Sequence, residues 1–231
     1  MTTMMEPLAE NLWVRRYPLS LLGAKAGRTV TLIRLPVSGE LVIHSTGPFS
    51  AADAAEFRAL GTPVWLVEAT NVHDTFARQG AAAFPDLPYF GPPGFARVAG
   101  VPARSLAEPP AAWAGVLDVL ALGGVPRVRE HVFLHRPSRT LIVADLVFNV
   151  GPGAPAWTRL LLRWVAGLRG GPGVSRIFRR LAVRDVGALR ASLETMLAWD
   201  FDRVVVGHGE VIASDGKRLL KAALSAAGFL G

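Results

Sequence analysis

Two stretches of the chain contain paired runs of β-branched and aliphatic residues separated by turn residues, and each pair predicts a β-hairpin. In the first, residues 29–35 and 40–44 flank a Pro-Val-Ser-Gly turn. In the second, residues 131–135 and 140–143 flank an Arg-Pro-Ser-Arg turn. The runs that follow the two turns, residues 40–44 and 140–143, have similar hydrophobic patterns. This similarity is a hint of two structurally related halves.

Helices are predicted by capping signals and by apolar residues that recur every three or four positions. Ser50 with Asp53 and Glu56 is typical of a capping box and predicts a helix that ends near Leu60. A longer apolar stripe predicts an amphipathic helix, and its members are Trp157, Leu160, Leu161, Trp164, Val165 and Leu168. A glycine-rich break at 170–173 ends it. Further helices are expected at 174–181, 186–198 and 215–229.

Buried strands are predicted where short apolar runs are bounded by turn residues or polar clusters. They cover residues 63–67, 116–120 and 203–206. Between Pro85 and Pro110 the chain holds seven prolines, so this part is expected to be mostly loop, with one short strand at 88–90. Strands and helices that alternate in this way indicate an α/β domain.

The composition favours one folded domain without a membrane span. With 231 residues, of which 51% are hydrophobic, the chain can bury a substantial core, and one domain is the simpler organisation. A transmembrane helix needs about 18 to 20 uninterrupted apolar residues, and no run reaches that length. The first residues include Glu6 and Glu10 and lack a basic start followed by an apolar run, so they do not indicate a secretory signal. We expect a cytoplasmic protein.

The absence of cysteine restricts the possible chemistry. Disulfides, thiolate catalysis and Cys-based metal sites are excluded, so any metal must be held by His, Asp, Glu or Asn. Three such side chains follow predicted buried strands, namely His73, Asp145 and His208. A side chain at the end of a strand can be held rigidly while its tip faces a cleft, as a metal ligand requires. Alternatively, these side chains have only structural roles and bind no metal. Asp145 then caps the turn after its strand, and His208 binds backbone groups of its glycine-flanked turn.

Two segments resemble a known family. Residues 140–148, TLIVADLVF, are similar to the segment of the metallo-β-lactamase superfamily in which an aspartate bridges two metal ions. Residues 204–212, VVVGHGEVI, resemble the segment that carries that family's last metal-binding histidine. The resemblance covers most of the chain and is closest to a little-characterised branch of the superfamily. It implies an α/β (α+β) fold, a four-layer αββα sandwich with the site at the edges of the sheets.

The chain departs from the family's metal-binding loop, whose pattern is HxHxDH. The corresponding residues are Asn71, Val72, His73, Asp74, Thr75 and Phe76. Only His73 matches in register, although a shift of one residue would bring in Asp74. The family's mid-chain histidine has no counterpart nearer than His131. A two-metal site usually needs about five or six protein ligands, so the chain is expected to hold at most one ion, Zn²⁺ or Fe²⁺, or none.

This ligand set leaves two functions open. In the first, His73, Asp145 and His208 hold one metal ion, with Asn71, Asp74 and His131 as weaker candidates, and the protein hydrolyses a small anionic or ester-type molecule. In the second, the polar residues are relics of the family's site. The protein is then a catalytically inactive binding or scaffold protein on the same fold.

The net charge of +7 originates in one segment. Residues 151–184 contain seven arginines and no lysine or acidic residue, and the other 18 basic residues equal the 18 acidic ones in number. The helical part, about 156–184, is expected to be a basic insertion or lid whose arginines contact an anionic substrate or an anionic membrane surface. Those arginines are Arg159, Arg163, Arg176, Arg179 and Arg180.

The alternative for this segment is that its apolar stripe belongs to the core and its arginines are simply solvated. Nucleic acid is a less favoured partner, because the segment is expected to lack exposed aromatic residues of the kind that stack on bases.

Overall fold

Two β-sheets form the centre of the computed structural model, which describes residues 4–21 and 23–230. The larger sheet has the order β1-β2-β5-β6-β7-β8-β9, with β1 (Glu6–Ala9), β2 (Leu12–Tyr17), β5 (Arg28–Arg34), β6 (Glu40–His44), β7 (Thr62–Val67), β8 (Tyr89–Gly91) and β9 (Arg104–Ser105). The smaller sheet has the order β10-β11-β12-β15, with β10 (Leu117–Ala121), β11 (His131–His135), β12 (Thr140–Ile142) and β15 (Arg203–Val205). All the strands predicted from the sequence are therefore present.

The two predicted hairpins lie in different sheets and share one pattern of strand pairing. β5 pairs antiparallel with β6, and β6 pairs parallel with β7. Likewise, β11 pairs antiparallel with β12, and β12 pairs parallel with β15. The hint of two related halves thus corresponds to a repeated arrangement of strands. Since neighbouring parallel strands end at the same edge of a sheet, the residues after β12 and β15 lie close together.

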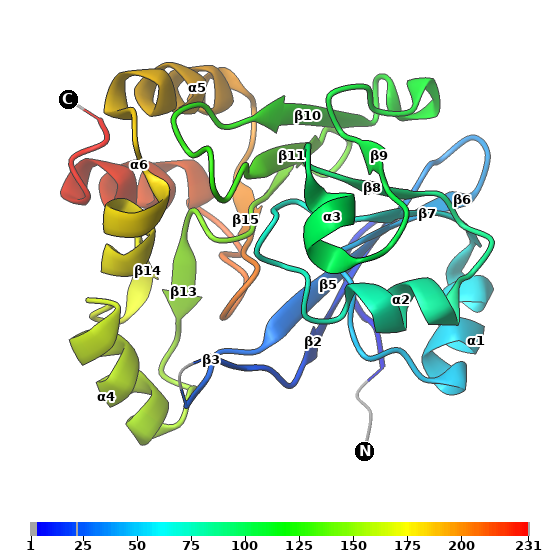
Figure 1. Ribbon diagram of the computed structural model, residues 1–231, viewed down its shortest axis with the longest axis horizontal. Helices are drawn as coiled ribbons and strands as arrows, with labels where there is room; N and C mark the ends of the chain where they lie inside the picture. The colour runs from blue at the N-terminus through cyan, green and yellow to red at the C-terminus, as the bar shows by residue number, and fades with distance from the viewer. Residues whose placement is uncertain (1–3, 22, 231) are drawn as a thin grey trace.

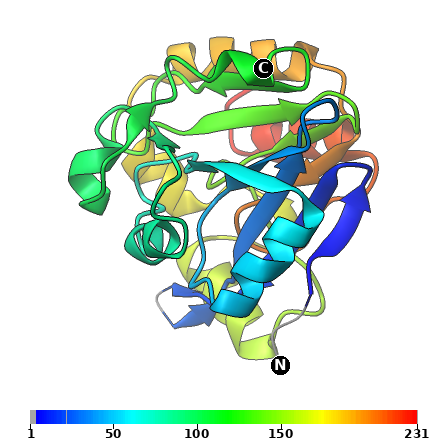
Figure 2. The same cartoon turned by 90° about the vertical axis from the view of Figure 1, so that its right-hand side faces the viewer.

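The sheets pack face to face, and helices cover their outer faces, which gives the four-layer αββα arrangement (Figures 1 and 2). Side chains from both sheets fill the space between them, among them Ile33, Trp65, Phe133, Ile142 and Val205. The helices on the larger sheet are α1 (Ala51–Leu60), α2 (Ala77–Ala83) and α3 (Phe95–Ala99). Those on the smaller sheet are α5 (Val186–Ala198) and α6 (Gly216–Ala226).

The predicted capping box at the start of α1 is confirmed. The Asp53 N–H donates to Ser50 Oγ at 3.2 Å, and the Ser50 N–H donates to Asp53 Oδ2 at 2.7 Å. In the proline-rich stretch, α3 and β9 were not predicted from the sequence. Helix α3 has only five residues between two glycines with positive φ, Gly94 and Gly100, so it is too short to produce a helical periodicity.

The segment after Asp145 differs from its prediction. The glycine-rich run forms a short strand, β14 (Gly171–Gly173), which pairs antiparallel with β13 (Phe148–Val150). A two-stranded sheet consists of edge strands only, where a proline is tolerated. The helix expected after this run is reduced to the π-helical turn η2 (Phe178–Ala182). A further small sheet pairs β3 (Ser20–Leu21) with β4 (Ala24–Lys25).

Helix α4 (Ala156–Val165) turns four of the six residues of its predicted apolar stripe toward solvent. The exposed side chains of that stripe are Trp157 (64%), Leu160 (47%), Trp164 (74%) and Val165 (41%). The residues that face the body include Thr158, Leu162 and Ala166, together with the stripe members Leu161 and Leu168. Thr158 Oγ1 accepts a hydrogen bond from the Lys25 backbone N–H at 3.1 Å. The alternative in which the apolar stripe belongs to the core therefore holds for two of its six residues only, and exposed aromatic residues are not lacking here. Among the described helices, not one has the length and hydropathy that a membrane span requires.

Candidate metal centre

Three side chains from distant parts of the chain meet beside the ends of β7, β12 and β15. His73 lies in the loop after β7, Asp145 follows β12 and His208 follows β15. Each offers one ligand atom, and these atoms all lie within 4.8 Å of one another. Within residues 4–21 and 23–230, this is the one group of three or more His, Asp or Glu side chains with such spacing.

The two distances from Asp145 to the histidines fit a metal ion bound among the three side chains. His73 Nε2 and His208 Nε2 each lie 3.3 Å from Asp145 Oδ1. Around a tetrahedral zinc ion with bonds of about 2.0–2.1 Å, neighbouring ligand atoms lie roughly 3.3 Å apart. Two histidines and one carboxylate suit Zn²⁺ and also non-haem Fe²⁺, and they leave coordination positions open for water or substrate.

The turn that carries His208 is fixed by its flanking glycines. Gly209 has a φ of 108°, and a Cβ at this position would lie 2.1 Å from the carbonyl oxygen of Asn149. At Gly207, a Cβ would lie 2.7 Å from the carbonyl oxygen of Ala144. Side chains larger than glycine therefore do not fit, and the close approach of this turn to the segment after β12 brings His208 next to Asp145.

A backbone hydrogen bond orients the His208 ring. Nδ1 lies 2.6 Å from the carbonyl oxygen of Gly27, which can only accept, so Nδ1 carries a proton and donates it. In the neutral ring, Nε2 then presents a lone pair to Asp145 Oδ1. These two acceptors repel each other unless a proton or a cation lies between them. The backbone contact expected if His208 had only a structural role is thus present. It uses only Nδ1, so Nε2 stays available as a metal ligand.

The second ring nitrogen of His73 faces a buried carboxylate. His73 Nδ1 lies 3.8 Å from Glu68 Oε2, and Glu68 is fully buried. The backbone N–H and the hydroxyl of Thr46 donate to Glu68 Oε1 at 2.7 and 2.6 Å. The buried guanidinium of Arg28 lies 3.8 Å from Glu68 Oε2. A carboxylate behind a metal-binding histidine orients its ring and makes the ring a better ligand.

Another buried carboxylate holds the segment around Asp145. Glu130 accepts hydrogen bonds from the backbone N–H groups of Ala144, Asp145 and Leu146 at 2.8, 3.2 and 3.1 Å. Burial, together with the nearby Asp145 charge, raises the pKa of Glu130 to about 8. Glu130 therefore acts on the centre through the backbone of its ligand and is a positioning residue.

Burial and neighbouring charges prepare the ligands for a cation. Burial lowers the pKa of His73 to about 3, and the positive charge of Arg28 contributes to this shift. Burial by itself would raise the pKa of Asp145, but the two histidines outweigh it and hold that pKa well below its usual range. At neutral pH, His73 is thus neutral and Asp145 ionised, which are the states that bind a metal ion.

The weaker ligand candidates lie outside the group of three. The Asn71 side-chain amide donates to the carbonyl oxygen of Pro93 at 3.3 Å. His131 Nδ1 lies 3.0 Å from the carbonyl oxygen of Arg129, and the residue lines a different pocket. Asp74 is half-buried, and its backbone carbonyl accepts from the N–H of the first residue of α2. The structure thus brings together three of the six candidate ligands.

The five candidate anion-binding arginines are exposed on α4 and around η2. They are Arg159, Arg163, Arg176, Arg179 and Arg180. Arg159 Nη1 donates to the carbonyl oxygens of Pro152 and Ala154 at 2.5 and 2.9 Å, so its side chain also fastens the loop before α4. The arginines that line the cavity beside the centre are instead Arg28 and Arg127.

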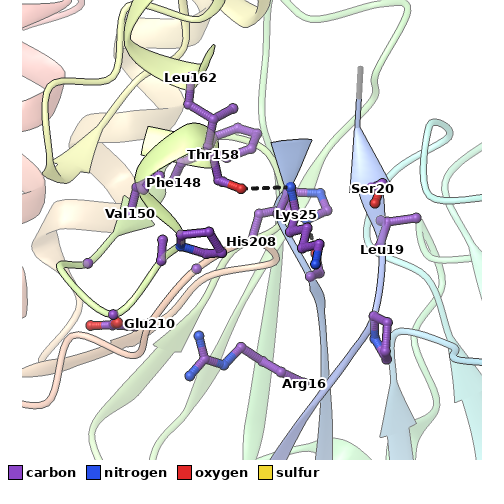
Figure 3. Close-up of a pocket in the computed structure, with 18 of the residues that line it drawn as sticks. Arg16, Leu19, Ser20, Lys25, Phe148, Val150, Thr158, Leu162, His208 and Glu210 are labelled. Carbon is purple, nitrogen blue, oxygen red and sulfur yellow. Dashed lines mark hydrogen bonds between the residues drawn. The ribbon is translucent and has the colours of Figure 1, made fainter. Parts of the chain in front are cut away.

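Two adjoining cavities border the centre. One, of about 540 Å³, has a largely apolar wall from α4 and η2, and His73, Asp145 and His208 all line it. The other, of about 600 Å³, is shown in Figure 3, where Arg16, Lys25 and Glu210 border the same space as His208. The residues that line both cavities are Leu19, Ser20, Phe148, Leu162 and His208.

The residues behind the candidate ligands were not predicted from the sequence. Glu68 directly follows a buried strand and belongs to the same polar cluster as His73, which is a signal that could have marked it. Arg28 directly precedes the predicted strand 29–35 and looks like an ordinary residue at a strand end. Glu130 precedes a strand, and its three partners lie 14 to 16 positions further along the chain, so no local pattern points to them.

The pKa of the buried His44 provides a test of how burial affects charged groups near the centre. It ends β6, is buried, and packs edge-on against Phe133 with ring centroids 4.7 Å apart. Neither ring nitrogen has a hydrogen-bond partner in the described part of the chain. Burial, with smaller effects from His73 and Arg28, lowers the pKa of His44 from 6.5 to about 3.

We expect His44→Phe to make the metal-free protein less sensitive to acid. Below pH 6.5 the unfolded chain binds a proton at His44 and the folded chain does not, so the wild type loses about 1.4 kcal/mol per pH unit from this group until the pH reaches its folded pKa. At about pH 4.5, the variant should have gained roughly 2.7 kcal/mol relative to the wild type, compared with the difference at pH 7. Urea denaturation in EDTA at both pH values measures this, and equal pH dependence in the two proteins would contradict it.

Comparison with solved structures identifies the fold of this chain. No family model and no curated relative matches the sequence. Among solved structures, the chain is similar to the metallo-β-lactamase from Pontibacter korlensis, with 14% identity, a TM-score of 0.66 and coverage of 97% of this chain and 98% of that one.

Two further solved structures are similar to this chain over nearly its whole length. The DIM-1 metallo-β-lactamase has 16% identity, a TM-score of 0.68 and coverage of 97% and 96%. FIM-1 from Pseudomonas aeruginosa, in a mono-zinc form, has 11% identity, a TM-score of 0.65 and coverage of 97% and 94%. Over nearly its whole length, this chain has the metallo-β-lactamase fold.

Proposed function

We propose that this protein is a metal-dependent hydrolase that uses one metal ion, held by His73, Asp145 and His208. The observation that carries the proposal is the convergence of their ligand atoms to within 4.8 Å. A two-metal site usually needs about five or six protein ligands, so three of them support a single ion. The mono-zinc form in which FIM-1 was crystallised is consistent with one ion on this fold.

When bound, a Zn²⁺ or Fe²⁺ ion would polarise a substrate oxygen and lower the pKa of a bound water molecule. The residues of the chain support this chemistry in two ways. Glu130 holds the Asp145 segment in place through hydrogen bonds, and Glu68 places a carboxyl group 3.8 Å behind the Nδ1 atom of His73. The apolar wall of the cavity, which includes Phe178 and Leu162, limits the access of water to the reacting group.

The two cavities favour a small substrate with an apolar part and a negatively charged part. The first cavity offers an apolar wall. The second is bordered by the exposed cations Arg16 and Lys25 and by one carboxylate, Glu210, so its lining carries a net positive charge that attracts negative charge. Because His208 lines both cavities, an ester that extends across them would have its scissile bond beside the metal centre. An anionic ester therefore fits better than a neutral one.

The competing candidate is a protein that binds a small molecule or a partner in this cleft without hydrolysing it. Asn71, Thr75 and Phe76 favour it, because they stand where the family's loop has a histidine, an aspartate and a histidine. The Asn71 side chain is also bound to Pro93 and not directed at the centre.

The two candidates differ in their response to added metal. We expect the metal-stripped protein to hydrolyse an aryl ester that bears a carboxylate only after Zn²⁺ or Fe²⁺ is added, and faster than a matched neutral ester. His208→Ala should lower the rate at least ~100-fold, since even outer residues of metal sites contribute about 10- to 100-fold.

His131→Ala is the matched control, because His131 is a buried histidine outside the group of three, and this variant should retain the activity. Wild-type protein that binds the metal and the ester without turnover would establish the binding protein instead.

A further inference from the structure

We infer that α4 and η2 form a docking surface for an anionic lipid membrane. The apolar part of this surface consists of exposed side chains, namely Trp157, Leu160, Trp164, Val165, Ile177 and Leu181. The basic part consists of exposed arginines, namely Arg159, Arg163, Arg169, Arg176, Arg179 and Arg180. We call these residues together the α4 surface.

Helix α4 exposes more apolar surface than an ordinary surface helix does. Leu162, which packs on the body, lies on the side of the helix opposite Leu160 and Trp164. Large apolar side chains therefore lie beside the arginines on the solvent side, and Trp164 is 74% exposed. Exposed apolar side chains that gather on one element usually mark a surface that binds another molecule.

The charge of the α4 surface requires an anionic partner. Residues 151–184 contain seven arginines and no acidic residue. All seven are exposed, and none of the ion pairs found between described residues includes one of them. Their positive charge is therefore not neutralised within the described part of the protein.

A second copy of the chain is a poor partner for this surface. A symmetric contact would bring the same arginines together from both copies, and like charges in a shared interface are costly. Single-stranded nucleic acid would match the charge and could stack on the two tryptophans, but it has no apolar surface to cover Leu160, Val165 and Leu181. A membrane matches both parts. Tryptophan and aliphatic side chains enter the boundary of the acyl chains, while arginines bind anionic head groups.

The α4 surface continues into the cavity beside the metal centre. Val165, Ile177 and Leu181 are exposed, and the same three residues line the apolar cavity. A membrane docked on α4 would therefore lie at the entrance of this cavity. The docking itself depends only on the surface residues, so its test is independent of the proposed hydrolase activity.

The test is sedimentation with vesicles of phosphatidylcholine alone and of phosphatidylcholine mixed with phosphatidylserine. We expect the wild type to bind the mixed vesicles, to bind them more weakly at high salt, and to bind neutral vesicles poorly. Trp157→Ala with Trp164→Ala, and separately Arg163→Glu with Arg180→Glu, should each reduce binding at least ~tenfold. Arg163 and Arg180 are chosen because their side chains form no hydrogen bond or ion pair within the described residues.

The matched control is Arg97→Glu with Lys221→Glu, which changes the net charge equally on the exposed faces of α3 and α6. This variant should bind nearly as the wild type does. Equal loss in the control would overturn the inference, because binding would then follow net charge alone. Loss on arginine reversal without loss on tryptophan replacement would also overturn it and indicate a soluble acidic partner.

Two direct outcomes would likewise refute it. One is tighter binding to a single-stranded oligonucleotide than to the mixed vesicles, and the other is self-association in sedimentation velocity that the tryptophan replacements abolish. All variants should unfold at nearly the wild-type temperature, because the altered side chains are exposed.

Discussion

Asp145→Ala should leave the protein unable to retain a metal ion, whereas the wild type purified from zinc-supplemented medium should contain about one per chain. Asp145 Oδ1 is the shared neighbour of both histidines, at 3.3 Å from each Nε2. Without it, two neutral nitrogens remain, and two ligands bind Zn²⁺ far more weakly than three. Elemental analysis of wild type, Asp145→Ala and His208→Ala measures the loss directly.

Thermal unfolding gives the same prediction a second readout. A ligand that binds only the folded state at about 1,000 times its Kd stabilises it by roughly 4 kcal/mol, so added Zn²⁺ should raise the Tm of the wild type by several degrees. Asp145→Ala should show almost no rise. Asp74→Ala is the matched control, because Asp74 lies beside His73 in sequence but outside the group of three. Wild-type protein that contains no metal and gains no stability from Zn²⁺ or Fe²⁺ would refute the metal centre.

Glu130→Ala is expected to be the most destabilising single substitution near the centre, at about 3 kcal/mol or more. The carboxyl group is fully buried and accepts from three consecutive backbone N–H groups. Its removal leaves these donors buried without an acceptor, and each such group costs about 1–3 kcal/mol. Urea denaturation of the metal-free proteins measures the difference in the free energy of unfolding.

Two further variants isolate the cause. Glu130→Gln keeps the shape and one carbonyl oxygen, so it should cost less than the alanine variant. Glu108→Ala removes an exposed carboxylate and should change stability by less than about 0.5 kcal/mol. If Glu130→Ala proved as stable as Glu108→Ala, the three hydrogen bonds would have no measurable importance.

Local patterns were sufficient to predict the smaller sheet, four strands of the larger sheet, most of the longer helices and the three converging candidate ligands. The hairpins, the capping box of α1 and the range 186–198 of α5 depend on residues close in sequence, and each is present. His73, Asp145 and His208 could be identified because each follows a buried strand. Their meeting at one point depends on how the strands pair, for which the sequence provided only the family resemblance.

The remaining features could not be predicted from the sequence, because they depend on interactions between residues that are distant along the chain. The apolar stripe of α4 has the periodicity of a buried face, yet the helix packs through Thr158 and Leu162. Thr158 is polar, and its burial is explained by its bond to the Lys25 N–H, which is 133 positions away. No pattern within the helix reports such a partner. The periodicity was therefore correct, but of the six stripe residues only Leu161 and Leu168 pack on the body.

The hydrogen bond from His208 to Gly27 also determines when the centre can form during synthesis of the chain. It joins residues 181 positions apart, and the three ligands are themselves spread from residue 73 to residue 208. A nascent chain on the ribosome therefore cannot complete the centre until its last strand has emerged. Because nuclei for folding form from contacts that are near in sequence, we expect a metal ion to bind late and to slow unfolding without accelerating folding.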